Sequence, residues 1–259
     1  MKEDNWQSCP TKEFEKWALG WSGCHGGDIS PGGIWICGIE WGGESTEDYL
    51  KNEIIKDRSE PPEGYDSENG NYCSQFDRGI FKIINAFKGI NILDYKTYDY
   101  YRNLPHKPFV KNGNCKGFFK INLYPIAFRR TNPKLWEEKF KNITGFKNKK
   151  EYKEWCRSPQ NRFGKIKEWV DCYKPRAIIC FGKTWEKDFG LAFTGENEID
   201  WKKESIDGNE PVEQKELIYK KCNNGGPIVI VCPFPSVGGL NSNKLLKACG
   251  CAIRNIINS

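Results

Sequence analysis

Four short apolar runs, each ended by a glycine or a proline, constrain the fold of this chain more than any other feature of its sequence. They occupy residues 34–39, 118–124, 177–182 and 228–232. Three of the runs are almost continuously apolar, which is typical of strands buried on both faces of a sheet. Apolar residues at helical spacing lie between and after the runs, at residues 76–87, 165–173 and 245–257.

Buried strands that alternate with helices predict an α/β fold, here a three-layer α/β/α sandwich with a central, mainly parallel, four-stranded sheet. The length of 259 residues suits a single domain spanning residues 1–259. Surface insertions are expected near residues 57–71, which contain prolines and glycines, and near residues 196–216, which are acidic and lack apolar periodicity. Residues 215–231, interrupted by Asn-Asn-Gly-Gly, form a candidate hairpin leading into the last apolar run.

Composition narrows the class of protein further. The mean hydropathy is −0.70 and no long apolar run occurs, so we expect no membrane span, no secretion signal and a cytoplasmic location. We also expect a monomer. Twelve cysteines are present but no Cys-x-x-Cys spacing occurs, which argues against a zinc site of the usual spacing. Cys37, Cys180 and Cys232 lie inside apolar runs, where a thiol behaves as a small apolar side chain. We therefore expect mostly reduced, buried thiols, no metal and no cofactor.

The residues that follow the runs are the candidate functional residues, because ligands of parallel sheets bind at the carboxyl ends of strands. Glu40 follows the first run within a glycine-rich turn, where glycines allow a substrate to approach the backbone closely. Asn122 ends the second run and offers both a donor and an acceptor for the edge of a nucleobase. The alternatives are an incidental glutamate in a tight turn and a buried asparagine that satisfies a turn.

The last run is followed by a loop, residues 233–244, that contains two prolines and then two glycines. Leu240 lies near its tip, and an apolar tip of this kind can wedge into a base stack. The alternative is an ordinary loop that caps the next helix through Ser242 or Asn243. The net charge of +6 is compatible with a nucleic-acid partner but does not require one.

Taken in chain order, these motifs resemble those of the uracil-DNA glycosylase superfamily. The corresponding segments are residues 38–42 (GIEWG), 121–125 (INLYP), 175–183 (PRAIICFGK) and 232–236 (CPFPS). The resemblance spans residues 34–257, and the INLYP segment is most similar to the single-strand-selective branch. It implies a monofunctional DNA glycosylase that flips a uracil-like or modified pyrimidine out of DNA and hydrolyses its N-glycosidic bond.

The resemblance also implies roles for individual residues. Glu40 would activate the attacking water, and Asn122 would bind the edge of the flipped base. The base-binding candidates are Trp41, Phe119, Asn122, Cys232 and Phe234. The DNA-binding candidates are Arg129, Arg130, Lys183, Ser236, Leu240 and Lys244. Basic residues are expected to share one face of the molecule, with the acidic insertion away from it.

Several departures from the family pattern leave the substrate open. Glu40 replaces an Asp or Asn, Trp41 replaces a Pro, and Cys232 replaces a His. A larger or modified pyrimidine, including the modified bases of viral DNA, is therefore an alternative to uracil, and its removal would be a defence function. Cys156 and Cys172 match half of the cluster pattern of an iron–sulfur branch, but the Cys-x-x-Cys of the other half is missing.

Two other classes of protein stay open. One is a DNA-binding relative that has the same fold but lacks the chemistry. The other is an unrelated nucleotide-binding α/β protein, against which the lack of a phosphate-loop motif argues.

Overall fold

The four predicted apolar strands form the centre of a single sheet. The structure is a computed structural model, and it describes residues 9–40, 46–65, 74–94, 104–111, 116–128, 136, 138–207, 215–223, 225–236 and 238–259. Neighbouring strands are, in order, β3 (Phe118–Asn122), β2 (Ile34–Gly38), β4 (Ala177–Phe181) and β7 (Ile228–Cys232). All three pairings are parallel. The predicted α/β class and the parallel arrangement of these strands are confirmed.

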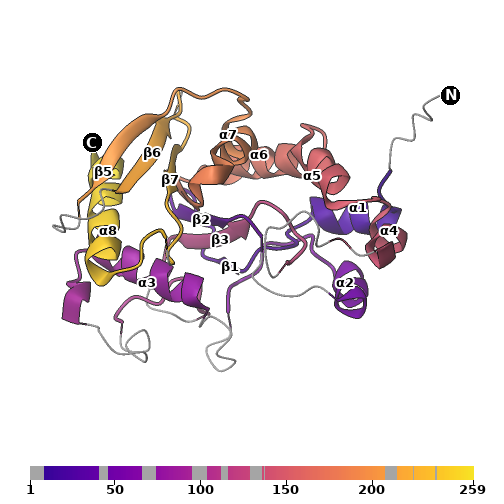
Figure 1. Ribbon diagram of the computed structural model, residues 1–259, viewed down its shortest axis with the longest axis horizontal. Coiled ribbons are helices and arrows are strands. Elements are labelled where there is room, and N and C mark those ends of the chain that lie inside the picture. Colours follow the sequence, from indigo (N-terminus) through magenta and orange to yellow (C-terminus); the bar gives the residue numbers. More distant parts are fainter. Residues whose placement is uncertain are drawn as a thin grey trace.

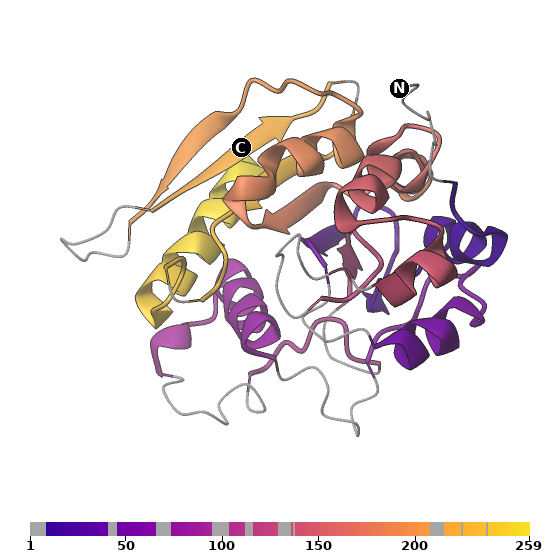
Figure 2. The same ribbon diagram turned by 45° about the vertical axis from the view of Figure 1, so that its right-hand side comes forward.

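Three antiparallel strands extend this centre to a seven-stranded sheet among the described residues. The short β1 (Gly26–Gly27) pairs with β3, and β6 (Lys215–Lys221) pairs with β7, which confirms the predicted hairpin. The outermost strand, β5 (Lys202–Ile206), pairs with β6 and lies next to α8 (Figure 2). The prediction of a surface loop at 196–216 is therefore wrong for this part. The sequence hides β5 because its only buried side chain is the last one, Ile206, so no apolar alternation is visible.

Helices cover both faces of the sheet (Figure 1). One face carries α3 (Gln75–Phe87) and α8 (Asn243–Asn258), whose apolar stripes pack on Ile34, Ile36 and Ile230. The other face carries α1 (Lys12–Leu19), α5 (Lys149–Arg157), α6 (Arg162–Tyr173) and α7 (Glu186–Thr194). The remaining helices are α2 (Glu47–Ile54), α4 (Glu138–Thr144) and the 3-10 turns η1 (Ile92–Asp94) and η3 (Lys183–Trp185). Each predicted helix is present with slightly longer bounds.

The cysteines and the first insertion also have defined places. Cys37, Cys180 and Cys232 are buried strand residues, as predicted, and every cysteine that the structure describes is a free thiol. The described part of the insertion near 57–71 is tied to the sheet edge by bridges from Glu63 to Gly26 and from Tyr65 to Val110. Among the described helices, none is long and apolar enough to cross a membrane.

Candidate functional site

The parallel strands bring the predicted site to one edge of the sheet. Glu40 lies just beyond β2, Asn122 ends β3, Lys183 follows β4, and the segment from Pro233 follows β7. Parallel strands present their carboxyl ends together, so these four segments are neighbours. Trp41, Arg129 and Arg130 lie outside the described residues.

Glu40 is a buried carboxylate with one bound oxygen and one free oxygen. Its side chain is only 4% exposed, and Lys149 Nζ donates to Oε1 at 3.2 Å. Within the described part of the chain, Oε2 is buried and has no hydrogen-bond partner. Burial raises the pKa of the Glu40 carboxyl, while Lys149 and Lys153 oppose this shift. A buried acceptor with no donor is costly to a fold, and such a group is a candidate for binding a water or a substrate.

The cations around Glu40 come from one stripe of α5. Lys149, Lys153 and Arg157 recur at every fourth position, so they occupy the same side of the helix. Lys149 and Lys153 are buried, and Lys149 Nζ lies 3.6 Å from the centroid of the Phe128 ring. This stripe was not among the predicted site residues, because lysines at helical spacing ordinarily form a solvated helix face.

Lys153 occupies an aromatic cage beside this carboxylate. Its Nζ lies 4.0 Å from the centroid of the Trp185 ring and 4.8 Å from that of Tyr124, distances at which cation–π attraction operates. No hydrogen bond or ion pair joins its Nζ to any described residue. Burial lowers the pKa of Lys153 to about 8, and the neighbouring charge of Lys149 acts in the same direction, against Glu40.

The end of the stripe is anchored to α7. Arg157 Nε and a terminal nitrogen donate to the two carboxylate oxygens of Asp188 at 2.8 and 2.9 Å, and bidentate pairs of this kind fix orientation. The Tyr124 hydroxyl donates to the same carboxylate at 2.7 Å. Asp188 thus joins α5, α7 and the segment after β3, which holds the aromatic cage in place.

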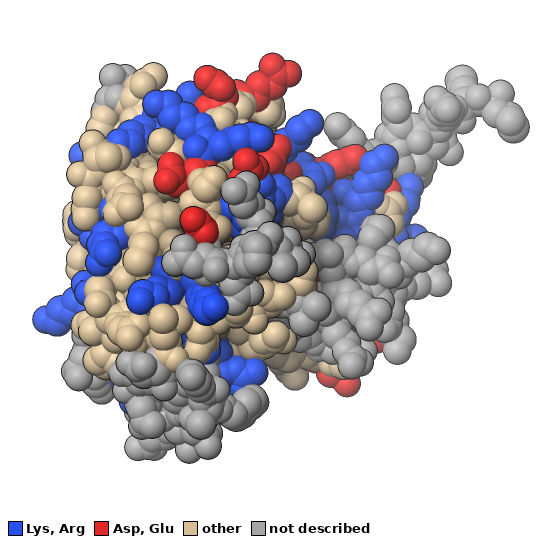
Figure 3. Space-filling model, turned by 60° about the vertical axis from the view of Figure 1, so that its left-hand side comes forward, with Lys and Arg blue, Asp and Glu red and all other residues tan. Residues whose placement is uncertain are grey.

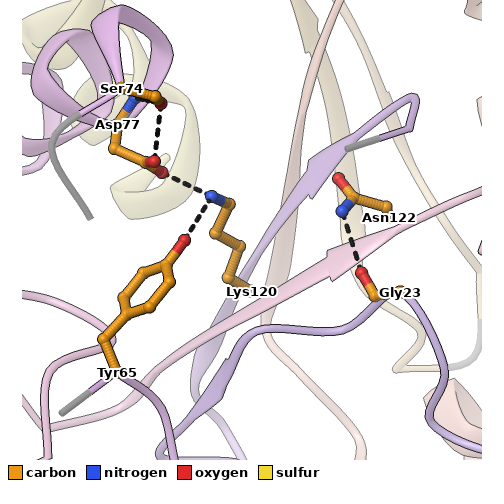
Figure 4. Close-up of polar contacts among 6 residues, drawn as sticks. All are labelled: Gly23, Tyr65, Ser74, Asp77, Lys120 and Asn122. Carbon is orange, nitrogen blue, oxygen red and sulfur yellow. Dashed lines mark hydrogen bonds and ion pairs between the residues drawn. The ribbon is translucent and has the colours of Figure 1, made fainter. Parts of the chain in front are cut away.

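The Asn122 side chain lies on the face of the sheet that carries α3, opposite the face that carries Lys149 of α5 (Figure 4). Its amide nitrogen donates to the Gly23 carbonyl at 2.8 Å. A Cβ at residue 38 would come within 2.4 Å of Asn122 Oδ1 and 3.6 Å of Phe76 Cζ, so a side chain there would press on the Asn122 amide. The surface over Gly38 is therefore bordered by Asn122 and Phe76. Phe76 was not among the predicted site residues, because in the sequence it is one more apolar residue of α3.

A buried charge network lies next to this surface, on the same face of the sheet. Lys120, two residues before Asn122 on the same face of β3, is paired with Asp77 of α3 (Figure 4). Its Nζ also donates to the Tyr65 hydroxyl at 3.0 Å, and Ser74 donates to Asp77 at 2.6 Å. The Lys120 ammonium is 5.4 Å from the Phe76 ring centroid. Burial lowers the pKa of Lys120, and Asp77 opposes that shift. The network fixes the start of α3 against β3 and so positions Phe76.

Phe234 is the one predicted base-binding residue after β7 that has an exposed ring. It is 39% exposed and stacks on Phe76, with ring centroids 4.8 Å apart. Leu240 is only 1% exposed, and its N–H donates to the Phe234 carbonyl, which folds the loop back onto the core. Leu240 therefore has a packing role instead of the predicted wedge role. Ser242 accepts from Leu245 N at 3.2 Å, so the helix-capping alternative is the one observed.

Two other base-binding predictions also fall on core residues. Phe119 is fully buried and packs edge-on against Trp21 and at a tilt against Trp35. Its burial leaves no ring face for a base, because β3 points it away from Asn122. Cys232 is fully buried, its thiol lies next to Cys249 of α8, and burial raises its pKa well above the ordinary value. The fold gives both residues core roles in place of the predicted base contacts.

Two adjoining hollows lie at the carboxyl ends of β4 and β7. One, of about 610 Å³, is lined by Lys183, Phe234 and Glu216, among others. The other, of about 830 Å³, shares Lys183 and is lined by Arg157 and Trp185 as well. Lys183 is thus well placed to meet a ligand at this edge.

The remaining predicted DNA-binding residues lie in the loop after β7 and in the first turn of α8. Ser236 is half-buried in the loop after Phe234, with its N–H bound to the Phe234 carbonyl. Lys244 is exposed in the first turn of α8.

Glu216 Oε2 lies 3.7 Å from Lys183 Nζ and 3.7 Å from Lys203 Nζ. The prediction that the acidic segment lies away from the basic face is therefore wrong at Glu216.

The described residues contain no group of three or more His, Cys, Asp or Glu side chains placed to hold a metal ion.

No protein-family model matches the chain, and the search of curated proteins gives no significant match. The likeness to uracil-DNA glycosylases consequently remains one of motifs and their order along the chain.

Proposed function

We propose that this chain is a DNA N-glycosylase with a uracil-DNA glycosylase-like sandwich, acting on a uracil-like or modified pyrimidine. The observation that carries the proposal is Glu40, a carboxylate held out of water at the end of a central parallel strand with Oε2 unpartnered among the described residues. Hydrolysis of an N-glycosidic bond needs an activated water, and a buried carboxylate with a free oxygen is a suitable base.

The same carboxylate suits the transition state. The bond to the base breaks as positive charge develops on the sugar, and a fixed negative charge nearby stabilises that charge. Lys149 holds Oε1 at 3.2 Å and so orients the group while leaving Oε2 for the water. In this proposal Lys149 is a positioning residue and Glu40 is the catalytic residue.

The base would lie on the α3 side of the same edge. Gly38 provides close approach, Asn122 provides a polar edge, and Phe76 and Phe234 provide ring surfaces. Stacking on an aromatic ring is worth about 1–3 kcal/mol per base. Lys183, which lines both hollows, would bind backbone phosphate, a contact that positions DNA without reading its sequence.

The test is release of free base from DNA. The chain is incubated with uracil-containing DNA, unmodified DNA and phage DNA with modified pyrimidines, and free base and abasic sites are quantified. Glu40→Gln keeps size and hydrogen bonding but removes the charge, so we expect single-turnover base release to fall by about 10²–10⁴-fold with DNA binding retained.

Glu154→Gln is the matched control, because it removes an exposed carboxylate from the same helix that carries Lys149. It should release base at the parental rate. Equal rates for Glu40→Gln and the parent would remove Glu40 from the mechanism. A parent that binds DNA but releases no base from any of the three substrates would leave the non-catalytic DNA-binding relative as the better description.

A further inference from the structure

The product of the proposed reaction carries a carbonyl group, and the site holds an amine suited to it. Loss of the base leaves a deoxyribose whose C1′ is a hemiacetal in equilibrium with an open-chain aldehyde. Lysine amines form imines with carbonyl substrates when they are desolvated or lie beside a second cation. We propose that Lys153 forms an imine with C1′ of an abasic site and that the chain thereby cleaves the DNA backbone there. This step rests on the proposed function for its place in the reaction, and it departs from the monofunctional chemistry that the resemblance implies.

The first support is the position of Lys153. It lies one helical turn after Lys149, whose ammonium binds Glu40, so both amines belong to the neighbourhood of the reacting sugar. Lys149 Nζ is occupied by a carboxylate, and Lys120 Nζ, on the other face of the sheet, is occupied by Asp77. Lys153 Nζ differs, because its contacts among the described residues are the ring faces of Trp185 and Tyr124. No acceptor among them has to be given up before this amine attacks.

The second support is the charge state of the amine. An ordinary lysine is almost wholly protonated at neutral pH and is a poor nucleophile. Burial lowers the pKa of Lys153 to about 8, Lys149 and Arg157 add to this shift, and Glu40 and Asp188 partly offset it. About half of the Lys153 side chains are therefore free amines at pH 8.

The third support is access. Trp185, whose ring covers the Lys153 ammonium, also forms part of the wall of the hollow of about 830 Å³ that contains Arg157 and Lys183. In the proposal, a sugar bound in this hollow with a phosphate on Lys183 reaches the Lys153 amine once the Trp185 ring moves aside.

The chemistry balances without any added reagent. The Lys153 nitrogen adds to the C1′ aldehyde, a C–N bond forms, and the carbonyl oxygen leaves as water. The imine acidifies C2′, and Glu40 accepts the C2′ proton. The electron pair of that C–H bond forms the C2′=C3′ double bond, while the pair of the C3′–O bond leaves with the phosphate oxygen. Water then hydrolyses the imine and restores the amine.

The test uses DNA that contains an abasic site prepared chemically, so it does not depend on base release. The full chain is incubated with this DNA and sodium borohydride, which reduces an imine to a stable amine. We expect a covalent protein–DNA complex, and peptide mass mapping should place the adduct on Lys153. Without borohydride, the strand should be cut on the 3′ side of the abasic site.

The matched variants are Lys153→Arg and Lys150→Arg. Both keep a positive charge, and Lys150 is an exposed lysine of the same helix. Lys153→Arg should form at least tenfold less complex, and Lys150→Arg should equal the parent. In the parent, complex formation should rise with pH to half its maximum near pH 8. Mass mapping needs no variant, so it decides the question even where Lys153→Arg folds poorly.

The outcomes separate the two proposals. Absence of a complex with the parent, or an adduct mapped to another amine, overturns the imine proposal and leaves base release untouched. A complex at Lys153 in a chain that releases no base from any substrate supports the imine and overturns the glycosylase proposal.

Discussion

Glu40 lies just beyond β2, and its surroundings act on the ionisation of its carboxyl group in two opposite directions. Burial raises its pKa above the ordinary glutamate value, and Lys149 and Lys153 lower it. A general base must be ionised, so the rate of base release should fall as pH falls through this raised pKa. The acid limb of kcat/KM against pH should therefore lie above the ordinary glutamate range.

Lys149→Met provides the sharper test of this residue. It removes the cation that favours the charged carboxylate, so the pKa of Glu40 should rise further and the acid limb should move to higher pH. Lys150→Met removes an exposed charge from the same helix and should leave the limb in place. The measurement is kcat/KM for base release between about pH 4 and pH 9. A limb that stays fixed in Lys149→Met would mean that another group titrates.

The sequence predicted individual site residues only where it also predicted the ends of the buried strands. Glu40 and Asn122 were found because glycine and proline mark where buried strands stop. Phe119 was misjudged because it lies three residues before Asn122 on β3, and alternation along a strand places residues at odd separations on opposite faces. Leu240 was misjudged because its exposure depends on a hydrogen bond to Phe234 that closes the loop, and such tertiary contacts leave no local signal.

At the scale of elements, apolar periodicity predicted the strands and helices that pack their apolar side chains in the core. The strands β2, β3, β4 and β7 and the helices α3, α6 and α8 bury apolar stripes that the sequence displays. The strand β5 and the cationic stripe of α5 (Lys149, Lys153 and Arg157) escaped prediction for the same reason. Both are polar in sequence, and both are specified by partners distant along the chain, β6 in one case and the Glu40 turn with α7 in the other.

The contact between α3 and α8 gives a prediction at this scale. A Cβ at Gly250 of α8 would come within 2.5 Å of the Ile83 carbonyl oxygen and 2.7 Å of Ala86 Cβ in α3. Alanine would raise helix propensity by about 1 kcal/mol, but forcing the helices apart costs about 1–3 kcal/mol. Gly250→Ala should therefore lower the free energy of unfolding measured in urea.

The exposed position Asn255, also in α8, is the control for that experiment. Asn255→Ala gains helix propensity without a clash, so it should be at least as stable as the parent. If Gly250→Ala proved as stable as Asn255→Ala, the close approach of the two helices would not be a constraint on the fold.

On the scale of the whole molecule, the sheet extension changes the electrostatics of the candidate site. Because β6 runs antiparallel to β7, its first residues reach the carboxyl edge and bring Glu216 between Lys183 and Lys203. Basic side chains spread over the side that carries α8 and the β5–β6 pair, with acidic ones mainly along its upper part (Figure 3). The chain thus has a net charge of +6, but the hollow that contains Lys183 also contains the negative charge of Glu216.

This arrangement predicts how DNA binding should depend on salt. Each phosphate neutralised by a cation releases counterions, so the dissociation constant should rise steeply between about 50 and 200 mM salt. Lys183→Ala should reduce the slope of log affinity against log salt by about one, whereas Lys51→Ala, which removes an exposed cation from α2, should not change it.

Glu216→Gln should tighten DNA binding, because it removes a negative charge from beside Lys183. Fluorescence anisotropy with a labelled duplex and a labelled single strand measures all three variants. An affinity that ignores salt, or a Glu216→Gln variant that binds more weakly than the parent, would show that DNA does not occupy this hollow.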